Sequence, residues 1–146
     1  MVTLRKDTTY LPIRIGVSSC LLGEEVRFDG GHKRDSFLVE TLGPIVEWVS
    51  VCPEVEVGLG TPREAIRLIR DRGELNGVRL VTRQTGSDLT RRMREYSRRR
   101  VRELTKERLS GYILKKDSPT CGMERVKVWD HRGTNEPNGR GIFAAE

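Results

Sequence analysis

The feature that most constrains the fold is a short apolar run that occurs three times, each time with a cysteine beyond it. The three pairs are Ile13–Val17 with Cys20, Ile45–Val51 with Cys52, and Gly111–Leu114 with Cys121. Short runs of this kind, rich in Ile and Val, are typical of buried strands. The sequence therefore predicts that each of the three cysteines of the chain follows a buried strand.

Helical patterns separate these strands. Asp88–Leu109 repeats apolar residues at a spacing that keeps them near one face, which predicts an amphipathic helix with an arginine-rich outer face. Shorter helices are predicted over Asp35–Leu42 and over Thr61–Arg72, where Thr61-Pro62-Arg63-Glu64 has the pattern of a capping box. Strands that alternate with helices predict an α/β fold, with an open, mainly parallel, Rossmann-like sheet flanked by helices.

Ligands bind to such sheets beyond the carboxyl ends of the strands. Cys20, Cys52 and Cys121 are all expected at the C-terminal ends of strands, and therefore at this one edge. We expect the three thiols to converge there although they are far apart in the sequence.

The remaining segments predict smaller elements. Leu75–Thr82 is expected to form an edge strand or a hairpin around Asn76-Gly77, and Val126–Trp129 a short strand. Gly133–Gly141 is expected to be a loop, with a glycine turn that opens a helix over residues 139–145.

A chain of 146 residues has the length of one domain, so we expect residues 1–12 to be a flexible lead-in and residues 13–146 a single domain. The net charge of +6 comes from 27 Lys and Arg interspersed with 21 Asp and Glu, which does not by itself predict nucleic-acid binding. No stretch approaches the roughly 20 apolar residues of a membrane span, and the N-terminus lacks a signal peptide's apolar core. The sequence predicts a cytoplasmic protein.

Three widely spaced cysteines make a poor disulfide framework, so the thiols have other interpretations. There are three such interpretations. The thiols could be inert core residues, ligands of an iron-sulfur cluster with one iron left open, or ligands of a closed zinc site together with His32 or His131. Spacing alone leaves all three open.

Two neighbouring side chains bear on this choice. Glu54 lies two residues after Cys52, and Ser118 three residues before Cys121, each next to a proline that stiffens the backbone. Alone, Glu54 is a helix-capping or surface carboxylate and Ser118 a turn former. Together with an open Lewis acid, a carboxyl and a hydroxyl suffice to activate water or to move a proton.

Six motifs, in order along residues 13–145, carry a resemblance to a known family. They are Ser19-Cys20-Leu21-Leu22-Gly23, Val26-Arg27-Phe28-Asp29-Gly30-Gly31-His32-Lys33, Val51-Cys52-Pro53-Glu54 with Thr61-Pro62-Arg63-Glu64, Gly86-Ser87-Asp88-Leu89-Thr90, Ile113-Leu114-Lys115 with Ser118-Pro119-Thr120-Cys121-Gly122, and Gly139-Arg140-Gly141-Ile142-Phe143. Together they resemble the successive signatures of the 2-thiouracil desulfurase family.

The resemblance implies a 4Fe-4S enzyme that removes sulfur from a thiolated pyrimidine without net redox change and releases uracil and hydrosulfide. Cys20, Cys52 and Cys121 would be the three cluster ligands and would leave one iron open to substrate. Glu54 would assist water in attacking the ring carbon, and Ser118 would donate or relay a proton.

The same resemblance makes Arg27, Asp29 and Lys115 candidates for orienting the polar edge of the base. It implies a small thiolated nucleobase as the partner, with 2-thiouracil as a representative. Family members usually continue beyond the Gly139–Phe143 motif, so this chain is expected to be a truncated or a minimal member.

Two other functions stay open at this point. One is a non-catalytic iron-sulfur or zinc module that senses redox state or docks a partner or RNA through the arginine-rich helix. The other is a desulfurase that accepts thiolated tRNA, for which the positive net charge is compatible but not diagnostic.

Overall fold

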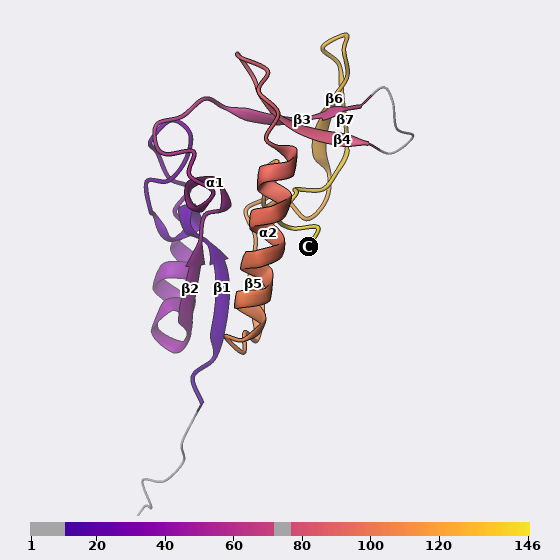
Figure 1. Ribbon diagram of the computed structural model, residues 1–146. Helices are drawn as coiled ribbons and strands as arrows, with labels where there is room; N and C mark the ends of the chain where they lie inside the picture. The colour runs from indigo at the N-terminus through magenta and orange to yellow at the C-terminus, as the bar shows by residue number, and fades with distance from the viewer. Residues whose placement is uncertain (1–10, 72–76) are drawn as a thin grey trace, which may run out of the picture.

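The computed structural model describes residues 11–71 and 77–146, and within them the chain forms two β-sheets and few helices (Figure 1). Sheet A has the strand order β2 (Glu47–Val51), β1 (Arg14–Ser18) and β5 (Gly111–Ile113). Sheet B has the order β4 (Val78–Thr82), β3 (Ile66–Arg70), β6 (Val126–Trp129) and β7 (Asn135–Gly139).

Sheet A is parallel throughout, because β1 pairs in parallel with β2 on one side and with β5 on the other. The chain reaches full burial toward the end of β1, where Val17 is 0% exposed. Gly16 lies beside the Tyr112 ring, and a Cβ at this position would be 2.2 Å from a ring carbon. Glycine is therefore required here for the aromatic side chain of β5 to pack across β1.

Sheet B is mixed. β3 pairs antiparallel with β4 and parallel with β6, and β7 closes the other edge antiparallel to β6. Alternate residues of its strands point into the core, where Leu68 and Leu80 are both 0% exposed. Figure 1 places sheet B beyond the carboxyl ends of the sheet A strands.

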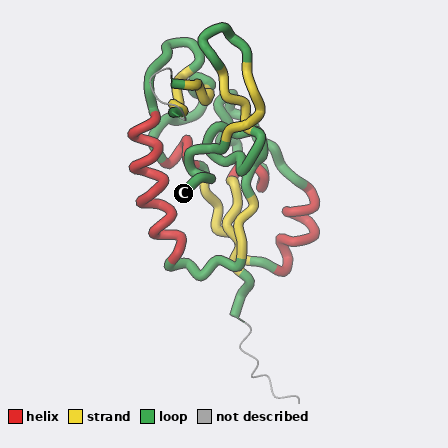
Figure 2. Tube along the Cα trace, turned by 90° about the vertical axis from the view of Figure 1, so that its right-hand side faces the viewer, coloured by secondary structure: helices red, strands yellow, loops and turns green. Residues whose placement is uncertain are grey.

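The main helix, α2 (Thr90–Thr105), runs alongside both sheets and buries Met93, Tyr96 and Leu104 (Figures 1 and 2). These side chains join one apolar cluster that includes Val51 of sheet A and Leu68 of sheet B. One core therefore connects the two sheets. Burial of apolar side chains is the main stabilising contribution that such a core makes.

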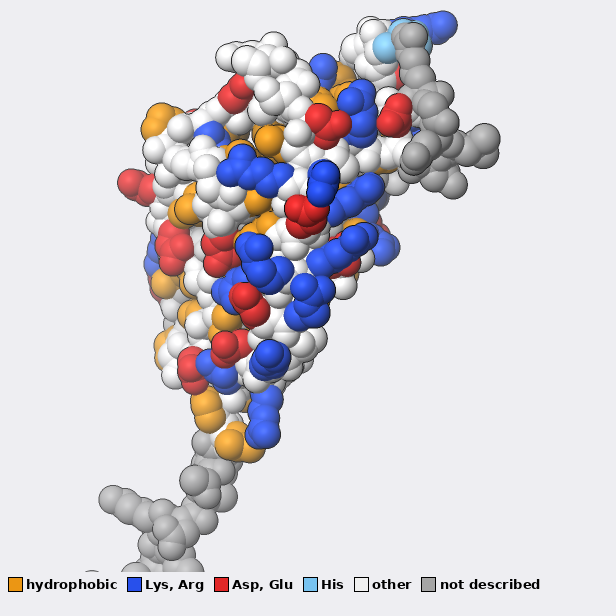
Figure 3. Space-filling model, viewed as in Figure 1, with side chains coloured by type: hydrophobic (Ala, Val, Ile, Leu, Met, Phe, Trp, Pro, Cys, Tyr) orange, Lys and Arg blue, Asp and Glu red, His pale blue; other side chains and the backbone are white. Residues whose placement is uncertain are grey.

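The outer face of α2 carries its arginines. Figure 3 shows basic side chains gathered on the face of the molecule that includes α2, with acidic side chains between them. Several of them form ion pairs, as Arg91 does with Glu95 at 2.8 Å and Arg98 with Glu146 at 3.2 Å. This mixture of charges is what a solvated helix face shows.

The α/β class is confirmed, but the single open sheet is wrong, because the mainly parallel arrangement is confined to sheet A. The helix predicted over Thr61–Arg72 is also wrong, since β3 occupies Ile66–Arg70. Glu64 does not close a capping box. Its carboxylate instead accepts hydrogen bonds from the backbone N–H groups of Gln84 and Thr85, which follow β4.

Several boundaries differ from expectation. Residues 133–141 contain β7 rather than only a loop, and residues 142–145 form turns rather than a helix. A short helix, α1 (Pro53–Glu56), follows Cys52, and the segment expected to be helical before Leu42 is a π-helix, Phe37–Leu42. The predicted lead-in, residues 1–12, lies almost wholly outside the described residues. The hairpin turn predicted around Asn76-Gly77 lies partly outside them.

No helix among those described is long and apolar enough to cross a membrane.

Candidate active site

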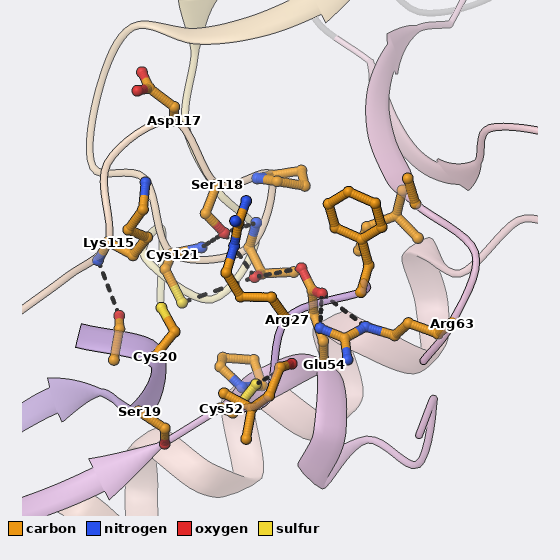
Figure 4. A pocket seen from close by; sticks show the side chains of 18 of the residues that line it. Ser19, Cys20, Arg27, Cys52, Glu54, Arg63, Lys115, Asp117, Ser118 and Cys121 are labelled. Carbon is orange, nitrogen blue, oxygen red and sulfur yellow. Dashed lines mark hydrogen bonds and ion pairs between the residues drawn. The ribbon is translucent and has the colours of Figure 1, made fainter. Parts of the chain in front are cut away.

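A cavity of about 270 Å³ lies where the carboxyl ends of the sheet A strands meet the start of β3 and the loop after β5 (Figure 4). All three cysteines line it. Cys20 belongs to the 3₁₀ turn Ser19–Leu22 that follows β1, Cys52 separates β2 from α1, and Cys121 lies in the loop beyond β5. The cavity therefore gathers thiols from three separate segments of the chain.

The three thiols are free, and burial disfavours their charged form. Loss of solvent raises the pKa of Cys20 and Cys52, and raises that of Cys121 to about 11. The positive charges of Lys115 and Arg27 oppose this shift at Cys20. Because thiols bind metal as thiolates, a metal centre bound here would have to release their protons.

Three cysteines, and no histidine of the described residues, line the cavity, and such a donor set fits an iron-sulfur cluster. Among the described residues, no three His, Cys, Asp or Glu side chains lie close enough to hold one metal ion. A cluster instead spreads its thiolate ligands over several irons. The histidines offered for a zinc site do not line the cavity: His32 accepts a hydrogen bond from the Arg34 N–H, and His131 lies in the exposed β6–β7 turn.

Glu54 is held beside the cysteines by a buried arginine. Glu54 lies in α1, and its side chain is 14% exposed. The side chain of Arg63 is 6% exposed. The Glu54 Oε2 accepts hydrogen bonds from Arg63 Nε at 3.0 Å and Nη2 at 2.5 Å. A charge-assisted pair of this kind holds that carboxylate oxygen in place, and its burial makes the loss of either partner costly.

Ser118 shapes the turn that carries Cys121. Its Oγ accepts hydrogen bonds from the backbone N–H of Thr120 at 3.2 Å and of Cys121 at 3.0 Å. Its carbonyl accepts the N–H of Gly122 at 2.9 Å. The serine is therefore a turn former, and at the same time its hydroxyl lies in the cavity wall together with Glu54 and the three cysteines (Figure 4).

The structure brings two of the three expected substrate-binding residues to the cavity. Arg27 and Lys115 line it, and burial lowers the pKa of the Lys115 ammonium. Asp29 does not line it. Its Oδ1 accepts the Gly31 N–H at 2.9 Å, a hydrogen bond that lowers the Asp29 pKa, so the residue closes an exposed turn.

Sequence reasoning missed two residues of the site. The pattern around Arg63 predicts a helix start, although its place in one motif group with Glu54 is a usable signal of their contact. Nothing in the Ser118–Gly122 motif singles out Thr120, yet its hydroxyl lies 3.3 Å from Glu54 Oε1 and 3.1 Å from Ser118 Oγ. No local pattern indicates the contact with Glu54, because Glu54 and Thr120 are remote in sequence.

Comparison with known proteins places these residues in context. Residues 15–146 match the family described as 2-thiouracil desulfurase. An uncharacterized protein of Bacillus subtilis (strain 168), YbbK, is 36% identical over 131 residues, which cover 88% of this chain and 85% of YbbK.

A solved structure shows the same likeness in three dimensions. It is that of a 4Fe-4S-dependent thiouracil desulfidase, TudS, which aligns with a TM-score of 0.70 and 30% identity. The alignment covers 90% of this chain and 82% of TudS.

Proposed function

The chain belongs to the 2-thiouracil desulfurase family, and on that premise we propose that it is a 4Fe-4S-dependent desulfidase that hydrolyses a thiolated pyrimidine such as 2-thiouracil. The products would be uracil and hydrosulfide, with no net change of oxidation state. One observation carries the proposal: Cys20, Cys52, Cys121, Glu54 and Ser118, which come from separate segments, line a single cavity.

In this proposal Cys20, Cys52 and Cys121 hold the cluster from the carboxyl edge of sheet A, which we infer to be the Rossmann-like part of the fold. When bound, the cluster supplies a Lewis-acidic iron with affinity for the soft sulfur of the substrate. The cysteines do no other chemistry.

Glu54 is the proposed general base. Arg63 occupies its Oε2, so Oε1, which accepts only a hydrogen bond from Thr120 among the bonds described, is the oxygen proposed to take a proton from water. Water that loses this proton attacks the thiocarbonyl carbon of the base. A positioned base of this kind contributes about 10²- to 10⁴-fold to a rate.

Ser118 is the proposed proton donor to the departing sulfur. Its Oγ accepts two backbone N–H groups, and these donors stabilise the negative charge that grows on the oxygen as its proton leaves. The two roles differ because Glu54 has a carboxylate paired with arginine, whereas Ser118 has a hydroxyl with a proton to give.

Arg27 and Lys115 are proposed to bind the polar edge of the base, since both line the cavity. The cavity volume of about 270 Å³ lies just below the ~300–1,000 Å³ usual for small-molecule sites. A cavity of this size suits a single nucleobase or another small molecule. We further propose that the protein acts in the cytoplasm.

The proposal is tested by anaerobic reconstitution with iron and sulfide, followed by detection of sulfide release with and without 2-thiouracil. We expect a brown protein that releases sulfide and uracil in equal amounts. A colourless protein that binds zinc stoichiometrically would reject it in favour of a non-catalytic zinc module. A brown protein without turnover would favour a redox-sensing module.

A further inference from the structure

Thr120 stands between the two residues proposed as base and proton donor. The residue is 1% exposed. Its Oγ1 lies 3.1 Å from Ser118 Oγ and 3.3 Å from Glu54 Oε1, with Cys121 Sγ at 3.7 Å. A single buried hydroxyl therefore touches both groups whose proton transfers the reaction needs.

The count of protons fixes the direction of these hydrogen bonds. Ser118 Oγ already accepts two backbone N–H groups, so its own hydrogen is free to donate, and Thr120 Oγ1 is the acceptor within reach. Thr120 then has one hydrogen to pass on. The Glu54 carboxylate is a stronger acceptor than a cysteine sulfur, so the chain runs from Ser118 through Thr120 to Glu54.

The backbone around Thr120 is fixed by the end of the described chain. The Thr120 carbonyl accepts the N–H groups of Phe143 and Ala144 at 3.0 and 3.1 Å. A Cβ on Gly141 would lie 2.4 Å from that carbonyl, so only glycine allows this close approach. The β-branched side chain adds its own stiffness at χ1. The hydroxyl thus has little freedom to leave its position.

We propose that Thr120 is a positioning residue of the desulfuration, which orients Ser118 and Glu54 toward each other and passes a proton between them. This inference rests on the function proposed above. When water attacks, one of its protons moves to Glu54. The Ser118 hydrogen turns from Thr120 Oγ1 to the departing sulfur and is transferred to it, which gives hydrosulfide.

Protonated Glu54 is then the donor and deprotonated Ser118 the acceptor, so the hydrogen bonds of the chain reverse. One proton passes from Glu54 through the Thr120 hydroxyl to Ser118, which returns both residues to their starting forms. The second proton of water leaves to solvent as the new C=O bond forms. The sum is thiocarbonyl plus water giving carbonyl, hydrosulfide and one proton, with no electrons gained or lost.

The test compares Thr120→Val, which keeps the shape and removes the hydroxyl, with Thr120→Ser, which keeps the hydroxyl. The reconstituted Thr120→Val protein is expected to keep its iron content and visible spectrum and to lose about 10- to 100-fold in kcat, with KM little changed. Thr120→Ser is expected to recover most of that loss. Thr134→Val, which removes an exposed hydroxyl bound to Asp130, is the matched control and should match the parent.

A purely structural role for Thr120 would give a different pattern. Equal kcat losses in Thr120→Val and Thr120→Ser would overturn the proposal, as would a Thr120→Val protein that loses its cluster or turns over at the parent rate.

A second measurement needs no activity. In the metal-free protein, Thr120→Val and Ser118→Ala each remove the same hydrogen bond between the two hydroxyls. The Tm of the double variant is therefore expected to fall by less than the sum of the two single decreases. Strict additivity would show that the two hydroxyls are not bonded and would overturn the inference. If the parent protein releases no sulfide while the Tm decreases are less than additive, the proposed desulfidase function is rejected, but the hydrogen bond between Ser118 and Thr120 is supported.

Discussion

Sheet A and sheet B contribute differently to the cavity between them. The strands of sheet A lead into Cys20 and Cys52 and, through the loop after β5, into Cys121. Sheet B contributes no cysteine among its described residues, but the segment before β3 supplies Arg63, which holds Glu54. Sheet A therefore presents the proposed cluster ligands, whereas the segment leading into sheet B supports Glu54, the proposed base beside them.

This division predicts that sheet A carries the largest effects. Cys121→Ser removes a buried proposed ligand, so we expect the protein to lose its visible cluster absorbance and all sulfide release. The measurement is the absorption spectrum and the turnover after anaerobic reconstitution. A brown, active Cys121→Ser protein would break the comparison at its strongest point.

The next largest effect is expected at Glu54. Glu54→Gln keeps the shape and removes the base, so the protein should stay brown and lose about 10²- to 10⁴-fold in kcat. Steady-state kinetics with 2-thiouracil would measure it. Parent-like turnover would show that Glu54 is not the base.

Sheet B enters the comparison through Arg63. Arg63→Ala leaves the buried Glu54 carboxylate without its partner, so we expect a loss of about 3 kcal/mol in the free energy of unfolding. Denaturant titration of the metal-free protein would show it. Arg63→Lys, which keeps the charge but not the two-point contact, serves as the control and should lose less.

The smallest effect is expected on sheet B away from the cavity. Arg79 of β4 is about half exposed and forms ion pairs with Asp71 at 3.6 Å and Asp88 at 3.3 Å. Exposed pairs contribute about 0.2–1 kcal/mol, so Arg79→Ala should lower the free energy of unfolding by no more than that and leave turnover unchanged. A marked loss of activity would mean that sheet B takes a larger part in the site than its position shows.

The two sheets also differ in how far the sequence predicted them. The sheet A strands are short apolar runs, and β1, β2 and β5 lie where such runs predict buried parallel strands. The strands of sheet B are harder to recognise. β3 places arginines at positions 67 and 70 among apolar residues, a spacing of three that also suits a helix.

Long-range contacts explain the remaining misses. The Glu64 carboxylate binds N–H groups that are 20 and 21 residues away rather than capping a local helix. The strand β7 contains Asn, Pro and Gly, which disfavour strands, and forms because it pairs at the edge with β6. The same holds for the site: the motifs indicated Glu54 and Ser118, whereas the Thr120 bridge between them depends on how the segments meet in space.

The most direct test of the account is the amount of iron bound per chain after anaerobic reconstitution and removal of excess metal. The account predicts about four irons per chain, matched by acid-labile sulfide, since three thiolates can hold one 4Fe-4S cluster. Binding of a single metal ion per chain, or of none, would contradict it.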